Sequence, residues 1–387
     1  MAILNILVIN AGSSSLKVSC FNGNLKRMHE AQLSGMQSAE PQLSFDDEKS
    51  VLAKPFSVKK GLELIFDLIR DFKPDAIAHR VVHGGSKYHS CQKITEEVLG
   101  DLRALSKLAP LHNPACVEGV EEAQKQFIGL PQFAVFDTAF HHTLPPAAYT
   151  YGIPHALTQK HNIKRYGFHG IAHSYLWKTY SRLTQDDEGS IITLHLGNGC
   201  SSTAIKKGFS IDTSMGFTPL EGLLMSSRSG DIDPSIIQFL TQEENLSVDE
   251  VTTLLNNKSG LLGISEISTD MKTLLSANTP QAKLAIEVFC YRCLKYIGAY
   301  QNILQGCNAI LFSGGIGENA SAIRKQIVAG LAWQGVFLDD QANEKAKGLS
   351  PGVSELISSA QSKIALYAVG VDENQAIAEE TRESLLS

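Results

Sequence analysis

Short apolar segments of strand length alternate along the chain with longer segments whose apolar residues recur at helical spacing. Helices are predicted at Val58–Phe72, Ile171–Leu183, Lys283–Tyr300 and Ala320–Leu331, with another beginning at Asn113-Pro114. Strands are predicted at Ile3–Ile9, Leu16–Phe21, Asp75–Ala78, Gln132–Phe136, Ser190–Leu196, Ser202–Ile205, Ala309–Phe312 and Ile364–Val369. This alternation is typical of α/β architecture.

One stretch of the chain is echoed about half a chain later. The segment Ile6–Gly23 is similar to Thr193–Gly208, and each copy predicts two strands joined by a turn of small residues. At a single offset, Gly12, Ser14 and Ser15 align with Gly199, Ser201 and Ser202. Two matched hairpins predict a duplicated, two-lobed protein whose hairpin tips expose backbone N–H groups.

Composition narrows the class of protein. A length of 387 residues suggests about two domains, and 43% hydrophobic with 19% charged residues is ordinary for a globular protein. The net charge of −6, without a Lys/Arg cluster, gives no footprint for nucleic acid or a membrane surface. The first ten residues lack the features of a signal peptide, so we expect a cytoplasmic protein with a small-molecule partner.

Cysteines and histidines do not form a metal-binding pattern in the sequence. Seven cysteines suggest free thiols, and Cys290 and Cys293 are expected to be buried in a helix without a second pair for zinc. The pairs His141-His142 and His79/His83 have no zinc-enzyme spacing, and His141 and His142, if in a strand, would point to opposite faces. We therefore expect no transition-metal site.

Three glycine-rich turns are candidates for binding phosphate. The two hairpin tips lack the Walker and dinucleotide-binding patterns, which disfavours a P-loop NTPase and a Rossmann dehydrogenase. Small residues let backbone N–H groups approach an anion, and Lys17 should share the polar strand face with Ser15. The third turn, Phe312–Asn319, joins a strand to a helix and is a plausible nucleotide seat. Tight connection without a ligand remains the alternative for each turn.

Four charged residues suit phosphoryl or acyl transfer. Arg80 and Asp137 end strands, His169 precedes a helix, and Arg228 lies in the long irregular segment Asp212–Asp233. Phosphoryl transfer needs cationic donors for the phosphoryl oxygens and a carboxylate near Mg²⁺. Singly, each residue could instead be a surface ion pair, a helix cap or a buried histidine. Together they indicate a phosphotransferase site.

Eight motifs give the chain a close resemblance to the acetokinase family, in the acetate and sugar kinase/actin superfamily. The resemblance covers almost the whole chain. The motifs are Asn10–Lys17, His79–Gly85, Leu108–Pro114, Phe136–Phe140, Tyr166–Gly170, His195–Gly199, Thr213–Gly222 and Gly314–Asn319.

The resemblance implies two ribonuclease-H-like, actin-like lobes, 1–149 plus 373–387 and 150–372, with the active site in the cleft between them. It implies Mg²⁺-dependent (or Mn²⁺-dependent) in-line transfer between ATP and acetate, giving ADP and acetyl phosphate, in a homodimer. Asp137, His169 and Arg228 would be catalytic, and Asn10 and Glu373 would belong to the metal site. Substrate would contact Arg80, Val82, Leu111, Phe168 and Pro219. Nucleotide would contact Ser14, Lys17, His195, Leu196, Gly197, Asn198, Gly199, Asp270, Met271, Lys272, Gly315, Ile316, Gly317, Glu318 and Asn319.

Departures from the family's usual pattern leave specificity open. Lys272 replaces a usual arginine at the nucleotide site, Ser226-Ser227 replace Gly-Thr, and Ile171-Ala172 replace Thr-Ser. Lysine lacks the planar fork of arginine, so nucleotide preference can differ. Two alternatives remain: a propionate or other short-chain acyl kinase, and an actin-like nucleotide-gated binding module that would not need the four charged residues.

Overall fold

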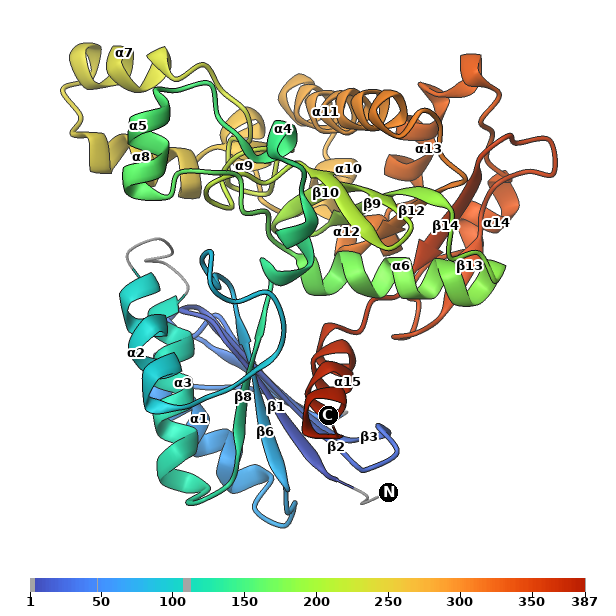
Figure 1. Ribbon diagram of the computed structural model, residues 1–387. Coiled ribbons are helices and arrows are strands. Elements are labelled where there is room, and N and C mark those ends of the chain that lie inside the picture. The colour runs from blue at the N-terminus through green and yellow to red at the C-terminus, as the bar shows by residue number, and fades with distance from the viewer. Residues whose placement is uncertain (1–3, 47, 107–112, 387) are drawn as a thin grey trace. The chain divides into compact units, whose positions relative to one another are not determined.

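The computed structural model describes residues 4–46, 48–106 and 113–386 (Figure 1). By their internal contacts these residues form two compact units, which we call unit 1 (Met1–Phe140 with Asp372–Ser387) and unit 2 (His141–Val371). The residues just after Phe140 bond within unit 2: His141 and Thr143 both form hydrogen bonds to Ser210. The lobe boundaries expected from the sequence, after residue 149 and before residue 373, stay a prediction.

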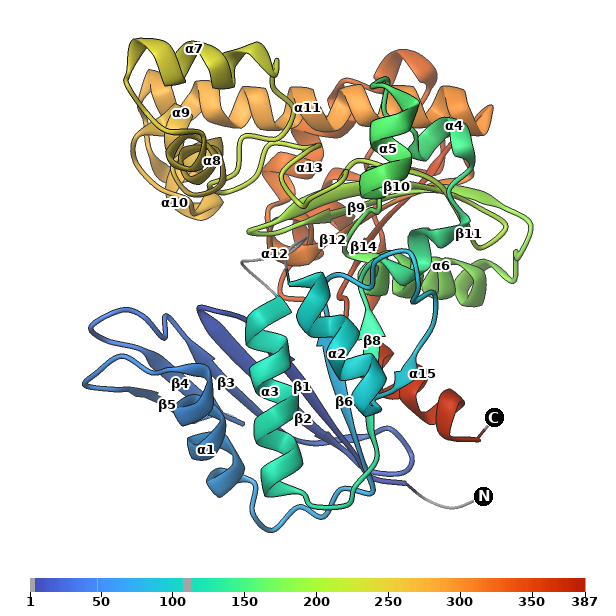
Figure 2. The ribbon, with the colours of Figure 1, turned by 60° about the vertical axis from the view of Figure 1, so that its left-hand side comes forward.

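Unit 1 is built on an eight-stranded mixed sheet of order β5-β4-β3-β2-β1-β6-β8-β7. β1 pairs with β2 antiparallel and with β6 parallel, and β6 pairs with β8 parallel. Helices α1 to α3 cover one face and α15 the other (Figures 1 and 2). The bounds are β1 Ile6–Ala11, β2 Ser15–Phe21, β3 Arg27–Ser34, β4 Gln42–Phe45, β5 Glu48–Val51, β6 Ala76–Val81, β7 Gln92–Lys93, β8 Gln132–Phe136, α1 Val58–Leu68, α2 Glu96–Leu105, α3 Asn113–Gln126 and α15 Glu373–Leu386.

Unit 2 is built on a six-stranded mixed sheet of order β11-β10-β9-β12-β14-β13. The strands are β9 Ser190–Leu196, β10 Cys200–Lys206, β11 Phe209–Thr213, β12 Ala309–Ser313, β13 Ser354–Leu356 and β14 Ala365–Val369. Its helices are α4 Pro146–Tyr149, α5 His155–His161, α6 Gly170–Thr184, α7 Ser235–Glu243, α8 Val248–Asn257, α9 Gly260–Ser265, α10 Met271–Ser276, α11 Pro280–Leu304, α12 Gly314–Asn319, α13 Ser321–Ala329 and α14 Asp340–Lys345, with 3₁₀ turns Ala139–Thr143 and Ala332–Gln334.

The duplication expected from the sequence is confirmed by the sheets. In each unit three antiparallel strands (β3-β2-β1 and β11-β10-β9) are followed by two parallel ones (β6-β8 and β12-β14) and a last antiparallel strand. The two echoed segments form the first hairpin of their sheets, β1–β2 and β9–β10. The mixed α/β, two-lobed class is therefore confirmed.

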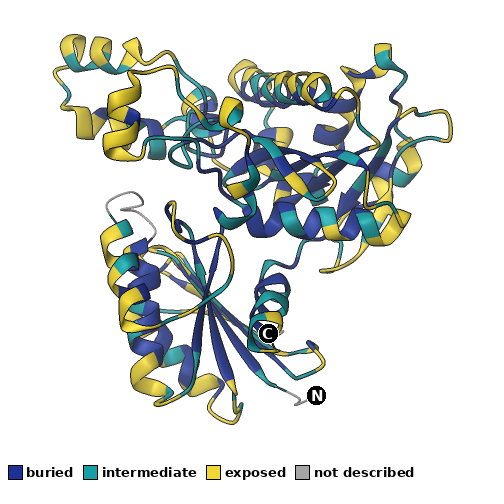
Figure 3. Cartoon of the chain, viewed as in Figure 1, coloured by how far each residue is buried: buried dark blue, intermediate teal, exposed yellow. Residues whose placement is uncertain are grey.

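Strand alternation decides which side chains of unit 1 reach the site. Leu7, Ile9 and Ala11 of β1 pack with Val58, Leu62 and Ile65 of α1 in one apolar cluster. Because neighbouring strand residues point to opposite faces, Asn10 faces the α15 side. Figure 3 shows the strands of both sheets as largely buried and the outer helix faces as exposed.

Three sequence expectations are wrong in detail. The glycine cluster after β12 is not a turn, because helix α12 begins at Gly314. Ser201 and Ser202 do not lie at a hairpin tip, since both are fully buried in β10. The pair His141-His142 lies in a 3₁₀ turn and not in a strand. In the first two cases the helix or strand begins earlier than the glycine and serine pattern indicated.

The two cysteines that were expected to be buried in a helix are found there. Cys290 and Cys293 are buried in α11, and burial raises the pKa of both thiols, that of Cys290 to about 12. None of the helices in the described part of the chain is long and apolar enough to cross a membrane.

Candidate active site

A row of polar side chains crosses three strands of unit 1. Asn10 and Lys17 are paired residues of β1 and β2, and Ile9 is level with His79 across the parallel β1–β6 pair, which places Arg80 beside Asn10. Val81 of β6 packs in the apolar cluster below α2 and α3, so Arg80 faces the α15 side with Asn10. The row lies near the carboxyl ends of the parallel strands, where open α/β sheets bind ligands.

Arg80 joins two carboxylates of unit 1. Its Nε and Nη2 donate to Oδ1 and Oδ2 of Asp137 at 3.0 and 2.8 Å, and its Nη1 lies 3.4 Å from Oε2 of Glu373. Burial opposes the charge of Arg80, but the two carboxylates outweigh it and raise the pKa of the guanidinium. Asp137 is only 1% exposed. The strand end and the first residue of α15 are thus linked through one arginine.

The start of α15 is held by further polar contacts. Asp372 forms an ion pair with Arg27, and the side-chain amide of Asn374 donates to Oγ of Ser19 at 2.8 Å. Lys17 lies 3.3 Å from Glu30. The contacts of Asp372 and Asn374 fix the backbone on both sides of Glu373.

The remaining unit 1 candidates occupy loops. Ser14 is exposed in the β1–β2 turn, and its carbonyl accepts from the backbone of Met36 at 3.0 Å. Val82 is half-buried directly after β6. Leu111 lies outside the described residues.

A pocket of about 900 Å³ in unit 2 collects most of the expected nucleotide residues. This volume is within the range of small-molecule sites. Lining residues come from the β9–β10 turn, the start of α10 and helix α12: Gly197, Asn198, Asp270, Met271, Lys272, Gly315, Ile316 and Asn319. His195, Leu196, Gly199, Gly317 and Glu318 are adjacent to these in sequence.

Two contacts order the pocket walls. Asp270 caps α10 by accepting from the backbone N–H of Thr273 at 2.8 Å, which leaves Lys272 exposed at the rim. Glu318 accepts from the backbone N–H groups of Gly314 at 2.9 Å and Val371 at 3.3 Å. Glu318 therefore connects the start of α12 to the segment that follows β14 and helps to hold the pocket wall in place.

His169 sits in a backbone conformation that is rare for its type. It is the N-cap of α6 at φ 56° and ψ 24°, in the left-handed region. Its ring stacks edge-on to that of His195, with centroids 5.0 Å apart, and its Nδ1 lies 2.8 Å from Oγ of Ser201. Strain of this kind concentrates at functional sites.

Gly199 brings His169 and Arg228 together. A Cβ at Gly199 would lie 3.1 Å from Cε1 of His169 and 3.6 Å from Nη1 of Arg228. Glycine in the β9–β10 turn thus permits both cationic-type side chains to approach one backbone position. Phe168, before His169, is 1% exposed.

Arg228 is largely enclosed, and no carboxylate in the described residues lies within ion-pair distance. Its Nη1 donates to the carbonyl of Pro219 at 3.3 Å. Burial lowers the pKa of the guanidinium below its ordinary value. A largely enclosed cation that contacts only neutral groups, the Pro219 carbonyl and the Met225 sulfur 4.0 Å away, is suited to bind an anion.

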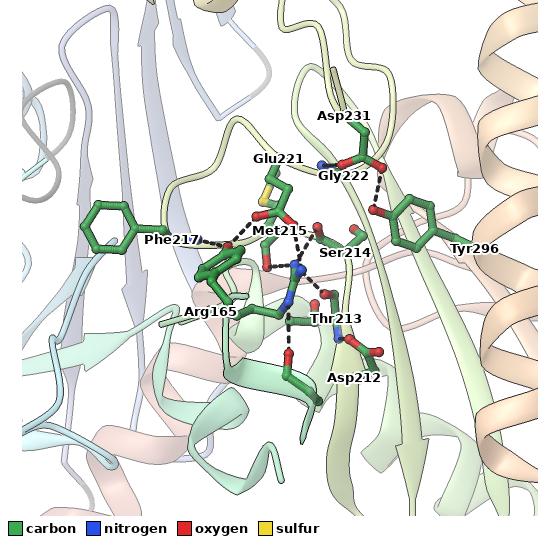
Figure 4. Close-up of polar contacts among 12 residues, drawn as sticks. Arg165, Asp212, Thr213, Ser214, Met215, Phe217, Glu221, Gly222, Asp231 and Tyr296 are labelled. Carbon is green, nitrogen blue, oxygen red and sulfur yellow. Dashed lines mark hydrogen bonds and ion pairs between the residues drawn. The ribbon is translucent and has the colours of Figure 1, made fainter. Parts of the chain in front are cut away.

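The loop that carries Pro219 and Arg228, residues 214–234, is anchored by Arg165 (Figure 4). The Arg165 Nη1 donates to the carbonyls of Thr213, Ser214 and Met215, each at 3.1 Å, and its Nη2 donates to Glu221 at 2.5 Å. We call residues 214–234 the substrate loop.

Four further hydrogen bonds, two at Tyr151 and two at Asp231, hold the substrate loop. The hydroxyl of Tyr151 donates to Glu221 and accepts from the backbone N–H of Phe217 at 2.8 Å. Asp231 accepts from Gly222 at 2.9 Å and from the Tyr296 hydroxyl at 2.8 Å (Figure 4). An irregular segment is therefore fixed by side chains in place of a backbone ladder.

The donor chemistry fits the expected magnesium ion. Asn10 and Glu373 provide oxygen ligands on one face of unit 1, and Mg²⁺ is commonly held by one or two carboxylates together with substrate phosphates. No group of three or more His, Cys, Asp or Glu side chains among residues 4–46, 48–106 and 113–386 is arranged to hold a metal ion.

The sequence patterns missed the residues that hold the candidates in place. Arg165 and Glu221 lie inside or beside family motifs but carry no spacing signal. Arg27 and Ser19 contact the start of α15 although they lie near the opposite end of the sequence. Asn374 and Ser19, for example, are separated by 355 residues. The only sequence signal for such residues was a position inside or next to a family motif, and only Arg165 and Glu221 had it.

Comparison with known proteins finds relatives that match over nearly the full length of the chain. The Acetokinase family model matches residues 5–379. Acetate kinase of Brachyspira hyodysenteriae is 42% identical over 398 residues, covering 98% of this chain and 99% of the relative.

Solved structures agree over the full length. An acetate kinase from Porphyromonas gingivalis gives a TM-score of 0.90 at 35% identity, covering 99% of this chain and 100% of that one. A propionate kinase from Francisella tularensis also gives 0.90, at 40% identity, covering 97% and 98%. With the fold, the motifs and these matches in agreement, the chain belongs to the acetokinase family.

Proposed function

We propose that the protein is an acetate kinase, an ATP:acetate phosphotransferase that reversibly forms acetyl phosphate and ADP. Family membership and full-length relatives named acetate kinase support this activity. The observation that carries it is the largely enclosed Arg228, which has no carboxylate within ion-pair distance among the described residues, beside His169 at Gly199 and close in sequence to the nucleotide pocket.

We assign the two sets of residues to one reaction. An oxygen of the acetate carboxylate attacks the γ-phosphorus of ATP, a new P–O bond forms, and the bond to the β-phosphate oxygen breaks in line with it. Arg80 and Arg228 hold the carboxylate and the transferring phosphoryl group, because a guanidinium fork matches both. His169 donates a hydrogen bond to the phosphoryl oxygens as charge spreads over them.

Asp137 fixes the orientation of the Arg80 guanidinium through their bidentate contact. Asn10 and Glu373 would hold Mg²⁺, which when bound neutralises phosphate charge. The residues lining the unit 2 pocket hold the nucleotide, and Ser14 and Lys17 approach its phosphates. Val82, Leu111, Phe168 and Pro219 would contact the acetate methyl group, as the family resemblance implies.

A propionate kinase is the second candidate for the same site. The propionate kinase of Francisella tularensis matches this chain as well as the acetate kinase structure does. One additional methylene changes discrimination by only about 1–3 kcal/mol. Homodimer formation and a cytoplasmic location stay predictions.

The first experiment traps acyl phosphate as hydroxamate with ATP and Mg²⁺, comparing acetate, propionate and butyrate. Acetate is repeated with GTP and with pyrophosphate, because Lys272 lies at the nucleotide rim. The highest kcat/KM with acetate and ATP supports the proposal, and a higher value with propionate supports the second candidate. No acyl phosphate from protein that still binds ATP favours the nucleotide-gated binding module.

A further inference from the structure

A chain of buried hydrogen bonds runs from the β9–β10 ladder to His169. Nδ1 of His169 and Nε2 of His173 each lie 2.8 Å from Oγ of Ser201, and Nδ1 of His173 lies 2.7 Å from Oγ1 of Thr193. The Thr193 hydroxyl in turn donates to the carbonyl of Thr203 at 3.3 Å. His173, Thr193 and Ser201 are all fully buried.

The Thr203 carbonyl sets the direction of this chain, because a carbonyl only accepts. The Thr193 hydroxyl donates its one proton to that carbonyl, so the Thr193 oxygen accepts from Nδ1–H of His173. Burial, with His141 and His195 nearby, lowers the pKa of His173 well below 6.5, so that ring stays neutral and its Nε2 carries a lone pair. The Ser201 hydroxyl then donates to Nε2 of His173, and its oxygen accepts from Nδ1–H of His169.

We propose that Thr193, His173 and Ser201 are positioning residues that hold His169 as the Nδ1–H tautomer, so that its Nε2 donates to a transferring phosphoryl group only when the ring is cationic. This inference rests on the proposed kinase function for its role in turnover. The tautomer itself follows from the hydrogen bonds and from the neutral state of the buried His173, and it does not depend on the proposed function. His169 is thereby an electrostatic donor and not a neutral one.

Three other ionisable groups lie near His169, and of these Arg228 is the cation. His195 on β9 lies against its ring, and Arg228 on the substrate loop approaches through Gly199. On its own helix, His173 is the ionisable neighbour reached through Ser201. Deprotonation of His169 would turn a lone pair toward the phosphoryl oxygens, so turnover should fall toward alkaline pH.

Two variants break the chain at different points. Ser201→Ala removes the hydroxyl that accepts from His169, and Thr193→Val removes the anchor while leaving Ser201 and His173 in place at nearly constant volume. Ser202→Ala is the matched control, because its buried Oγ has no hydrogen-bond partner in the described structure and strand alternation turns it to the other face.

The first measurement is the tautomer, read from two-bond ¹H–¹⁵N NMR correlations of protein with ¹⁵N-labelled histidine. Loss of one correlation pattern in His169→Asn identifies the residue. We expect the Nδ1–H pattern for neutral His169 in the unaltered protein and in Ser202→Ala, and a population of Nε2–H in Ser201→Ala and Thr193→Val. An Nε2–H pattern in the unaltered protein would overturn the inference.

The second measurement is kcat for acyl phosphate formation against pH. Both chain variants should lose roughly 10- to 100-fold at neutral pH, with a shallower alkaline decline because their neutral His169 can donate from Nε2. A profile merely displaced downward in parallel would mean a structural role only, which contradicts the inference. Absence of all kinase activity with the Nδ1–H pattern intact would reject the proposed function while the tautomer assignment stands.

Discussion

Arg228 has a charge that nothing in the described protein neutralises, and this decides its expected role. Its guanidinium is enclosed, donates to the Pro219 carbonyl and has its pKa lowered by burial. An anion that enters the site would relieve this cost, so we expect Arg228 to stabilise the reacting phosphoryl or carboxylate group more than it stabilises the fold.

Arg228→Ala should therefore lower kcat for acyl phosphate formation by on the order of 10³-fold, because one phosphoryl-binding arginine supplies an effect of that size. The affinity for ATP, measured by calorimetry, should change little, since Arg228 is not among the residues that line the pocket. Arg182→Ala, on the exposed side of α6, is the control. Turnover close to that of the unaltered protein would remove Arg228 from the mechanism.

Asp137 has the opposite character, since both of its oxygens are bound by Arg80. Asp137→Asn removes the charge that balances a buried guanidinium, and we expect the free energy of unfolding of unit 1 to fall by about 2–3 kcal/mol. Urea unfolding followed by circular dichroism measures this.

Glu121→Gln gives the comparison for Asp137. It breaks the exposed Arg103–Glu121 pair, whose atoms lie 2.6 Å apart, and should cost less than about 1 kcal/mol. Equal losses in the two variants would show that Asp137 contributes no more than a surface ion pair.

At the scale of elements, the substrate loop is an irregular segment that owes its shape to Arg165. One guanidinium satisfies three consecutive carbonyls and one carboxylate, a combination that the single ammonium of lysine cannot reproduce. The loop in turn carries Pro219 and Arg228. Under the proposed function we therefore expect Arg165 to act on substrate binding through the order of the loop.

Arg165→Lys should reduce kcat by about tenfold or more and raise the KM for acetate, while the KM for ATP stays near that of the unaltered protein. Steady-state kinetics with each substrate varied in turn separates these effects. Arg182→Lys makes the same exchange on an exposed helix face and should be neutral. A selective rise in the KM for ATP would contradict this role of Arg165.

At the scale of the whole molecule, buried neutral histidines make stability depend on pH. Burial lowers the pKa of His79 in unit 1 and of His141 in unit 2 to about 4, and it also lowers the pKa of His173 well below its ordinary value. The unfolded chain binds protons at these groups near pH 6.5, whereas the folded chain does not. Stability therefore rises with pH between about 4 and 6.5 and is lost as the pH falls through that window.

The expected loss is on the order of 3 kcal/mol for each of His79 and His141 between pH 6.5 and pH 4. Both tryptophans, Trp177 and Trp333, belong to unit 2, so urea unfolding followed by tryptophan fluorescence reports on His141. His141→Gln should flatten the pH dependence, and the exposed-site variant His155→Gln should keep it. An unaltered slope in His141→Gln would exclude this source.

Local pattern was enough for the central strands and the long helices. The strands Gln132–Phe136 and Ser190–Leu196 have the bounds expected from the sequence, because a continuous apolar run marks a strand buried on both faces. The outer strands β3, β4, β5, β7, β11 and β13 were not predicted. Edge strands are short and partly polar, so their pairing depends on a neighbour and not on their own residues.

The sequence by itself determined the family, the duplicated α/β plan and which residue types the site would hold, because hydrophobic period and motif spacing are local properties. The tertiary structure alone decided the partners of these residues: Arg80 between Asp137 and Glu373, Arg165 under the substrate loop, and Ser201 between two histidines. Buried polar groups need hydrogen-bond partners, and only the folded chain brings those partners together. Those partners lie tens to hundreds of residues away, as for Arg80 and Glu373, where no local pattern reaches.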